Sequence, residues 1–275
     1  MHDPVGRSRM SFVEISNVDL IYGGVAGTKT DEPALALSAL DLRLEKGAFV
    51  AVVGPSGCGK STLLKLVAGL INPSRGMVRI NGQTVHKPVS GVGMAFQAPT
   101  LLPWRNIRDN VVLPLEIVEP YRSQSKTQRK ESYARADALL EAVGLGQFGT
   151  HMPWQLSGGM QQRAQICRAL IHDPSILLLD EPFGALDTFT REELWGVMQA
   201  LWLDKRCTVV LVTHELREAV YLSDTVHVMS ARPGRVIASR TIELPRPRSL
   251  ETTFEPTFVQ YVHDCRHHIS LGNTS

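Results

Sequence analysis

The sequence lacks a long hydrophobic run: no stretch approaches the ~18 consecutive apolar residues that a bilayer-spanning helix needs. The opening residues, MHDPVGRSRM, also lack the apolar segment of a signal peptide. We therefore expect that, if the protein works at a membrane, another chain spans it.

Cysteine is scarce as well, and the four cysteines are scattered without a C-x-x-C pair. This usage argues against a zinc site or a disulfide framework and fits a reducing cytoplasm. Charge of one sign is not in excess either, because 29 Lys and Arg face 27 Asp and Glu, for a formal net charge of +2. Binding nucleic acid by bulk electrostatics needs a stronger basic bias, so nucleic acid is not an expected partner.

Strands and helices are expected to alternate along most of the 275 residues. Alternating apolar and polar residues predict a strand at 12–22, and mainly apolar segments predict strands at 49–53, 175–180, 208–213 and 225–230. Helical patterns follow the glycine loop at 54–62 to about residue 70 and occur at 158–171, around 188–204 and from 215. A hairpin is expected at 76–85, with its turn at Asn81-Gly82. This order predicts an α/β fold with a mostly parallel core sheet covered on both faces.

Two segments depart from that alternation. The charged, then amphipathic stretch at 122–145 predicts an inserted α-helical subdomain at about 98–165. Near the end, Pro256 suits a first helical turn, and apolar residues recur at helical spacing at Phe258, Val262, Cys265 and Ile269. The expected division is therefore a tail at 1–11, a main domain at 12–244 and a C-terminal helical extension at 245–275.

The stretch GPSGCGKST at 54–62 fits the pattern G-x-x-x-x-G-K-[ST] between an expected strand and helix. Its glycines let backbone N–H groups surround a phosphate, and the helix N-terminus adds positive potential. Lys60 should reach the β- and γ-phosphates, and Ser61 should hold Mg²⁺. The expected binding residues of this loop are Gly54, Pro55, Ser56, Gly57, Cys58, Gly59, Lys60, Ser61 and Thr62.

Two later strand ends carry polar side chains. Asp180, which ends the apolar run ILLLD, is placed to act on Mg²⁺ through water. Glu181 points elsewhere and is placed to polarise a water that attacks the γ-phosphate. His214 ends the strand TVVLVT, where parallel sheets bind ligands, so we assign it a γ-phosphate contact; a structural histidine is the alternative.

A second glycine loop, LSGGMQQR at 156–163, resembles half of a nucleotide site. Ser157 can cap the following helix, and Gly158 and Gly159 admit a phosphate, but no lysine follows. We therefore expect the loop to meet the nucleotide held by a second copy, so that a two-fold dimer forms two composite sites. The alternative is a capped helix start and nothing more.

Taken in order, GPSGCGKST, MAFQAP, LSGGMQQR, ILLLDEP, GALD and VTHE resemble the ATP-binding subunit of ABC transporters, from about residue 12 to 240. The resemblance implies a P-loop NTPase fold with an N-terminal antiparallel β part, and ATP and Mg²⁺ as cofactors. It also implies that Tyr22 stacks on adenine, unless Tyr22 is a core residue. Gln97 then touches Mg²⁺ beside Ser61 and Asp180, and Asp187 links the two sites across the dimer. Met160 stands where the LSGG motif of this family is usually followed by a glutamine.

Narrower segments at 101–111, 180–195 and 231–236 look like the taurine, sulfonate and nitrate importers, whose relatives also carry pyrimidines. This likeness implies an ATPase subunit at the cytoplasmic face of the inner membrane, with membrane permease subunits and a solute-binding protein as partners. The apolar run Leu101–Trp104 is expected to receive a permease helix or, alternatively, to pack the helical subdomain.

Two rival functions are weighed against the importer. A soluble ABC ATPase of DNA repair carries a long coiled coil between the glycine loops, and one of translation usually has two cassettes; neither feature is present here. A small-molecule kinase with a phosphate loop leaves LSGGM unexplained.

Overall fold

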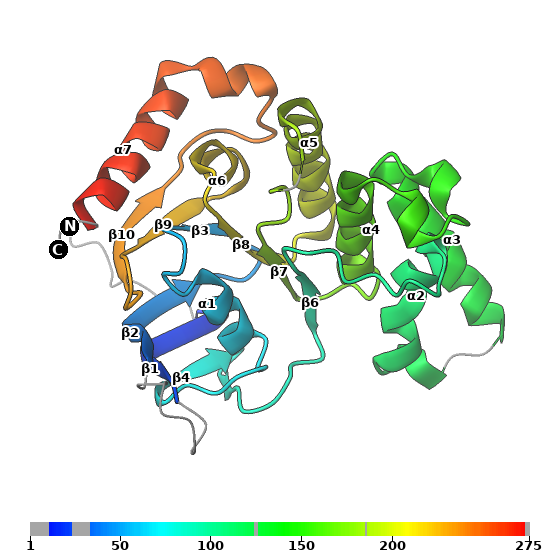
Figure 1. The fold of residues 1–275 in the computed structure, drawn as a ribbon, viewed down its shortest axis with the longest axis horizontal. Helices are drawn as coiled ribbons and strands as arrows, with labels where there is room; N and C mark the ends of the chain where they lie inside the picture. Colours follow the sequence, from blue (N-terminus) through cyan, green and yellow to red (C-terminus); the bar gives the residue numbers. More distant parts are fainter. Residues whose placement is uncertain (1–10, 24–33, 124–125, 185, 273–275) are drawn as a thin grey trace, which may run out of the picture.

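The computed structural model describes residues 11–23, 34–123, 126–184 and 186–272, so the expected tail lies outside it except for Ser11. A six-stranded sheet, in the order β10-β9-β3-β8-β7-β6, forms the centre (Figure 1). Its neighbours pair in parallel except β10 and β9, which confirms the mostly parallel core sheet. Its strands are β3 (Phe49–Val53), β6 (Val92–Ala95), β7 (Ile176–Asp180), β8 (Thr208–Thr213), β9 (Thr225–Met229) and β10 (Val236–Thr241).

A separate antiparallel sheet holds the N-terminal strands in the order β2-β1-β4-β5. These strands are β1 (Val13–Tyr22), β2 (Ala34–Leu44), β4 (Arg75–Ile80) and β5 (Gln83–Thr84). The predicted hairpin is confirmed, because β4 and β5 pair around Asn81 and Gly82, whose φ values are 50° and 76°. Positive φ at both central residues is what a tight two-residue turn needs.

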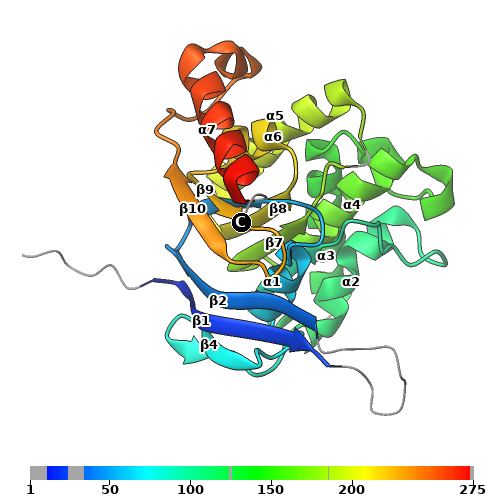
Figure 2. The same ribbon diagram turned by 60° about the vertical axis from the view of Figure 1, so that its left-hand side comes forward.

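Helices cover both faces of the core sheet (Figure 2). On one face α1 (Lys60–Val67) packs its leucines against Val50 and Val52 of β3 and against the antiparallel sheet. On the other face α5 (Thr188–Lys205), α6 (Leu216–Leu222) and α7 (Pro256–Gly272) pack against Phe49 and Ala51 of the same strand. Because successive residues point to opposite faces and both faces are buried, the central strands read as continuous apolar runs.

The helical region has its own hydrophobic cluster. It contains α2 (Ile107–Ile117), α3 (Lys126–Ala142) and α4 (Gly158–Leu170), with short 3₁₀ turns at Tyr121–Ser123, Gly146–Phe148 and Pro153–Gln155. A further 3₁₀ turn, Leu250–Phe254, precedes α7 outside this region. Gln162 and Gln165 of α4 both donate to the Phe96 carbonyl, which ties this region to the chain leaving β6. The run at 101–104 is split. Leu101 is buried in the cluster of the helical region, as the packing alternative expected, whereas Trp104 is 71% exposed.

Two local expectations also change. The helix after the first glycine loop ends at Val67 rather than near residue 70. The cause is Gly69, whose φ is +71° and whose missing side chain leaves room for the Lys87 carbonyl. The strands β6 and β10 were not expected, because β6 is short and β10 has no fully buried residue.

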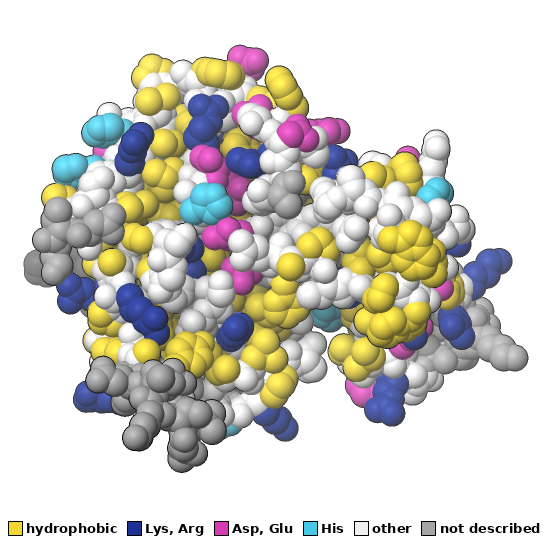
Figure 3. All heavy atoms as spheres, viewed as in Figure 1, with side chains coloured by type: hydrophobic (Ala, Val, Ile, Leu, Met, Phe, Trp, Pro, Cys, Tyr) yellow, Lys and Arg dark blue, Asp and Glu magenta, His cyan; other side chains and the backbone are white. Residues whose placement is uncertain are grey.

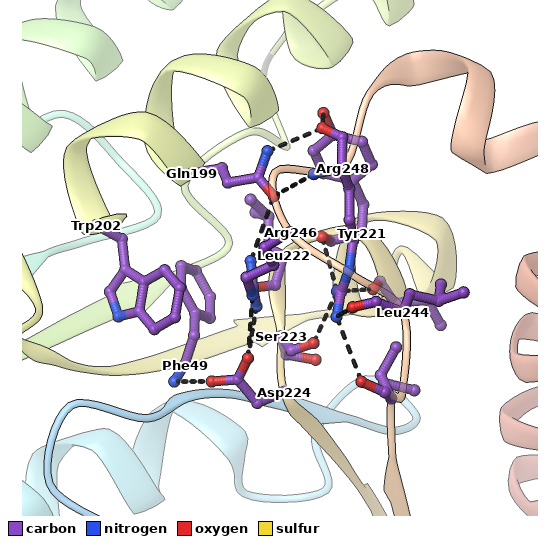
Figure 4. A network of polar contacts seen from close by, with 12 residues as sticks. Phe49, Gln199, Trp202, Tyr221, Leu222, Ser223, Asp224, Leu244, Arg246 and Arg248 are labelled. Atoms are coloured by element: carbon purple, nitrogen blue, oxygen red, sulfur yellow. Dashed lines mark hydrogen bonds and ion pairs between the residues drawn. The ribbon is translucent and has the colours of Figure 1, made fainter. Parts of the chain in front are cut away.

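The C-terminal extension packs on its own domain, and its apolar face is the predicted one. Phe258 and Cys265 are 1% exposed, and Val262 and Ile269 pack against the same core cluster. The segment leading into α7 is held by Arg248, which is 3% exposed (Figure 4). Its Nη1 donates to the Val220, Tyr221 and Ser223 carbonyls at the C-terminal end of α6, at 2.7–2.9 Å.

Further polar contacts complete this attachment (Figure 4). The Gln199 amide bonds both the N–H and the carbonyl of Arg248, each at 2.8 Å. Arg246 donates to Asp224 and stacks 4.4 Å from the Trp202 ring centroid. Burial lowers the pKa of Arg248 to about 10, so the guanidinium stays charged at neutral pH and depends on these carbonyls.

We expect Arg248→Ala to lower the free energy of unfolding by about 3 kcal/mol, because several buried carbonyls lose their donor. Chemical denaturation with urea measures the change. Arg240→Ala is the matched control: its half-exposed side chain pairs with Asp264 at 2.8 Å, a surface ion pair worth about 1 kcal/mol or less. Equal losses in the two variants would contradict the expected role of Arg248.

Candidate nucleotide site

A cavity of about 450 Å³ lies where β3, β7 and β8 end at their carboxyl termini. Such sheets bind ligands at this edge. It is lined by Tyr22, Ala36, Ser56, Gly57, Gly59, Lys60, Ser61, Thr62, Gln97, Glu181, His214 and Arg232. The cavity therefore brings together predicted residues from five separate segments of the chain.

The first glycine loop forms one wall of this cavity. Gly57 and Gly59 have φ values of +76° and +101°, and a side chain at Gly57 would meet open space. Lys60 is 6% exposed, and its Nζ donates to the Gly54 and Pro55 carbonyls at 2.8 and 2.9 Å. The ammonium group is thus held at the loop itself, where a phosphate enclosed by the backbone N–H groups would meet it.

The loop residues Gly54, Pro55 and Cys58, all of which the structure describes, lie outside the cavity lining. The Cys58 side chain is 1% exposed and belongs to the hydrophobic cluster beneath the loop. Burial raises the pKa of its thiol. Cys58 can therefore contribute to binding only through its backbone.

Ser61 and Asp180 meet as expected of a Mg²⁺ site. The Ser61 hydroxyl donates to Asp180 Oδ1 at 2.9 Å. Burial raises the pKa of Asp180, and the bond from Ser61 opposes that rise. Ser61 lines the cavity, whereas Asp180, its hydrogen-bond partner, is not part of the lining. Their hydroxyl and carboxylate oxygens match the donor set that Mg²⁺ prefers, so these residues fit the ion.

Glu181 is the meeting point of the remaining polar groups. Its Oε2 accepts from Gln97 Nε2 at 3.2 Å and lies 3.2 Å from His214 Nδ1. Its φ is +45°, and its backbone N–H donates to the Val212 carbonyl at 2.8 Å. Left-handed backbone at a non-glycine residue costs free energy and concentrates at functional sites.

Two parts of the cavity were harder to predict from the sequence: the position of Tyr22, and the far wall formed by Ala36 and Arg232. Tyr22 is 43% exposed, and its hydroxyl lies 3.1 Å from Thr62 Oγ1, so it is not a core tyrosine; adenine stacking stays a prediction. Ala36 and Arg232 line the cavity but were not expected. The loop that carries Arg232 comes close because Gly234 has no side chain, which would clash with the Cys58 carbonyl of the glycine loop.

Ser157, Gly158, Gly159 and Asp187 are described by the structure but lie outside the cavity lining. Ser157 caps α4 by accepting from the Met160 N–H at 3.3 Å, and Asp187 caps α5 by accepting from Thr190 at 3.0 Å. The Met160 side chain packs on the helical cluster, so its difference from glutamine leaves the cap intact. One chain alone does not bring these four residues to its own nucleotide cavity.

Comparisons with known proteins agree on the family. The family profile described as ABC transporter matches residues 37–184. The aliphatic sulfonates import ATP-binding protein SsuB of Bacillus cereus is 42% identical over 237 residues, which cover 86% of this chain and 88% of that protein. The chain belongs to the ABC transporter family.

Two other curated relatives of this ABC protein are similarly close. The taurine import ATP-binding protein TauB of Ruegeria pomeroyi is 40% identical over 228 residues, which cover 82% of this chain and 81% of that protein. The nitrate import ATP-binding protein NrtD of a Synechocystis species is 38% identical, with 90% and 91% covered.

A solved structure matches the fold of this ABC protein. The ATP-binding cassette MJ0796, solved as a dimer in a post-hydrolysis state bound to ADP and Pi, superimposes with a TM-score of 0.73. It is 31% identical, and the match covers 85% of this chain and 100% of that one. The protein is therefore an ABC-type ATPase with the fold of an ABC nucleotide-binding domain. Within the described ranges, this ATPase has no helix that is both long and apolar enough to cross a membrane.

A buried carboxyl group lies in the first turn of α6 in this ABC protein. Glu218 is 2% exposed beside Thr213 and Trp195, and burial raises the pKa of its carboxyl from 4.5 to about 8. The folded state therefore keeps a proton that the unfolded chain releases. Stability is greatest below the unfolded pKa and falls as pH rises through the folded pKa.

We expect Glu218→Gln to remove that dependence, because the amide does not ionise. We therefore compare the melting temperature of the variant with that of the unchanged protein at each pH. This difference should shift in favour of the variant by several degrees as the pH is raised from about 5 to about 9. Thermal unfolding at both pH values measures the difference. The exposed Glu193 on α5 supplies the control Glu193→Gln, and an equal change in that variant would count against a specific effect of Glu218.

Proposed function

We propose that this ATPase subunit homodimerises around two ATP molecules and energises import of a sulfonate, taurine or nitrate-like solute through separate membrane permease subunits. The observation that carries the proposal is the meeting of Gln97, Glu181 and His214 in the nucleotide cavity. The solute class is supported by relatives named as sulfonate, taurine and nitrate import proteins. The subunit then lies at the cytoplasmic face of the inner membrane, and a solute-binding protein delivers the cargo.

The residues of one chain divide the reaction between them. Lys60 and the loop N–H groups bind the phosphates, and Glu181 polarises the attacking water. The side chains of Gln97 and His214 orient the Glu181 carboxylate. Ser61, Asp180 and Gln97 would hold Mg²⁺, which would supply positive charge that offsets the negative charge of the phosphates.

The second copy completes each site. Ser157, Gly158 and Gly159 lie outside the cavity of their own chain, so they are free to face the nucleotide of the partner. A helix N-terminus with two glycines suits a phosphate. The dimeric form of the related cassette MJ0796 supports this arrangement, with Asp187 near the contact.

The permease contact is proposed at the helical region. Hydrophobic side chains gather on that part of the face drawn in Figure 3. Trp104 and Trp154 are 71% and 65% exposed, and backbone bonds from Ile107 to His151 and from Arg108 to Gly149 place their segments side by side. Exposed apolar surface of this kind marks a partner site, and tryptophan is enriched among interface anchors.

Coupling can pass from the nucleotide to this surface through short links. Gln97 bonds Glu181, and the neighbouring Phe96 carbonyl accepts from Gln162 and Gln165 of α4. Gln165 also accepts from the Thr100 N–H at 2.7 Å, just before the segment that carries Trp104. A change at the γ-phosphate is thereby connected to the helical region.

We expect Trp104→Ala to leave folding and ATP affinity of the isolated subunit nearly unchanged while transport and membrane association fall by about tenfold or more. Uptake in cells and co-purification with a multi-span membrane protein measure the loss. Phe254→Ala is the control, since Phe254 is also 71% exposed but lies on the C-terminal extension. Normal assembly and uptake by Trp104→Ala would place the permease contact elsewhere.

The solute itself is tested by growth. A deletion strain should fail to grow with the true solute as its only sulfur or nitrogen source, and the gene should restore growth. Failure with aliphatic sulfonates, taurine or nitrate supports the proposed class. Failure with a pyrimidine alone favours the alternative importer, and normal growth with no permease in the pull-down favours an ABC ATPase unlinked to transport.

A further inference from the structure

Arg191 connects two segments that are far apart in the sequence, the loop before α5 and the residue after His214. It lies in the first turns of α5, where its N–H donates to the Asp187 carbonyl at 3.0 Å. Its Nη2 donates to the Leu186 carbonyl at 2.9 Å, and its Nη1 lies 3.8 Å from Glu215 Oε2. One guanidinium therefore contacts both the loop that ends at Asp187 and the residue that follows His214.

The first end of this link reaches the second glycine loop. The Leu186 side chain packs directly on Gly159, so closely that a side chain at Gly159 would collide with it. Asp187 in turn caps α5 through the Thr190 N–H. Fixing the Leu186 carbonyl consequently fixes the surface that is proposed to face the nucleotide of the other copy.

The second end reaches the catalytic glutamate of the same chain. Glu215 is itself held, because its N–H donates to Thr213 Oγ1 at 2.9 Å and its Oε1 accepts from the Arg217 N–H at 3.2 Å. It directly follows His214, whose Nδ1 lies 3.2 Å from Glu181 Oε2. Displacing Glu215 therefore displaces the histidine that contacts Glu181.

Two acidic side chains lie near Arg191, and Glu215 is the one that carries the ion pair. The neighbouring Glu218 is 2% exposed, and burial raises its pKa to about 8, so it is mostly uncharged at neutral pH. Glu215 is then the anionic partner of the guanidinium. The side chains of Arg191 and Glu215 are 23% and 35% exposed, and their attraction is less screened than that of a fully exposed pair.

We propose that Arg191 is a positioning residue that couples the two composite ATP sites, by linking His214 of one site to the loop that faces the other. The inference rests on the proposed dimer. In this arrangement the state of Glu181 and His214 reaches Leu186 and Gly159 through one side chain. Loss of Arg191 should weaken ATP-driven closure without weakening the first binding of ATP.

The test uses the full-length Glu181→Gln variant, in which bound ATP is not turned over. Adding Arg191→Met should raise the ATP concentration for half-maximal dimer formation by about tenfold, while ATP affinity of the monomer changes by less than about twofold. Sedimentation and nucleotide titration measure the two quantities. Glu215→Gln should shift dimer formation in the same direction, and the two changes together should do no more than one alone, because they break one contact.

Arg217→Met is the matched control, since the Arg217 side chain turns away to Thr253 and the Phe254 ring. Unchanged dimer formation in Arg191→Met or in Glu215→Gln overturns the inference, and so do fully additive effects. Should Arg191→Met unfold, Glu215→Gln decides alone, because it keeps the guanidinium and the α6 cap. If the parent Glu181→Gln chain stays monomeric with ATP, the proposed dimer itself has failed, which is a different result.

Discussion

Lys60→Ala should lose detectable ATP hydrolysis, a fall of about 10³-fold or more, and should bind nucleotide more weakly. Lys60 is the cation within the glycine loop, with its Nζ already at the Gly54 and Pro55 carbonyls. Phosphoryl transfer depends on charge stabilisation by fixed groups, and alanine removes this group without filling its place. Phosphate release and nucleotide titration on the isolated subunit measure both effects.

Two control variants make this result specific. Lys65→Ala removes an exposed lysine from the same helix and should hydrolyse ATP normally. Arg232→Ala removes the cation on the far wall and should weaken binding more than it slows turnover. Hydrolysis at the normal rate by Lys60→Ala would contradict the assignment of the loop as the phosphate site.

The core of the fold was predictable because its strands are buried on both faces. Runs such as 49–53 and 209–212 are apolar without interruption, and each is followed by a glycine or polar residue where the strand ends. The motifs lie at those ends, so their order in the sequence also placed them at one edge of the sheet. That is why most of the expected cavity residues do line the cavity.

Contacts between distant segments were harder to predict. Arg232 reaches the cavity because Gly234 lets its loop approach Cys58. That approach is a contact of the tertiary structure, which the sequence alone does not reveal. Leu101 is buried although its neighbours suggest a continuous exposed run. Arg248 was overlooked for another reason: a charged residue in an irregular segment reads as solvent-exposed, whereas here the carbonyls at the end of α6 surround it.

Glu181→Gln should slow hydrolysis by at least about 10²-fold while ATP still binds. The amide keeps the shape of the side chain and its contact with Gln97, but it cannot accept the proton of the attacking water. Because ATP then persists, two chains should remain together around it. Sedimentation of this variant with Mg-ATP should show a dimer, and removal of nucleotide should return the monomer.

Ser157→Arg in the same background separates a composite site from a simple helix cap. Ser157 lies outside the cavity of its own chain, so its replacement should leave ATP affinity of the monomer unchanged. The arginine side chain puts bulk where the partner's phosphate must lie, and the dimer should therefore be lost. Ser175→Arg, on a distant surface of the chain, should leave the dimer intact. A Glu181→Gln chain that stays monomeric at saturating ATP, or a Ser157→Arg chain that still dimerises, would show that LSGGM serves only to begin α4.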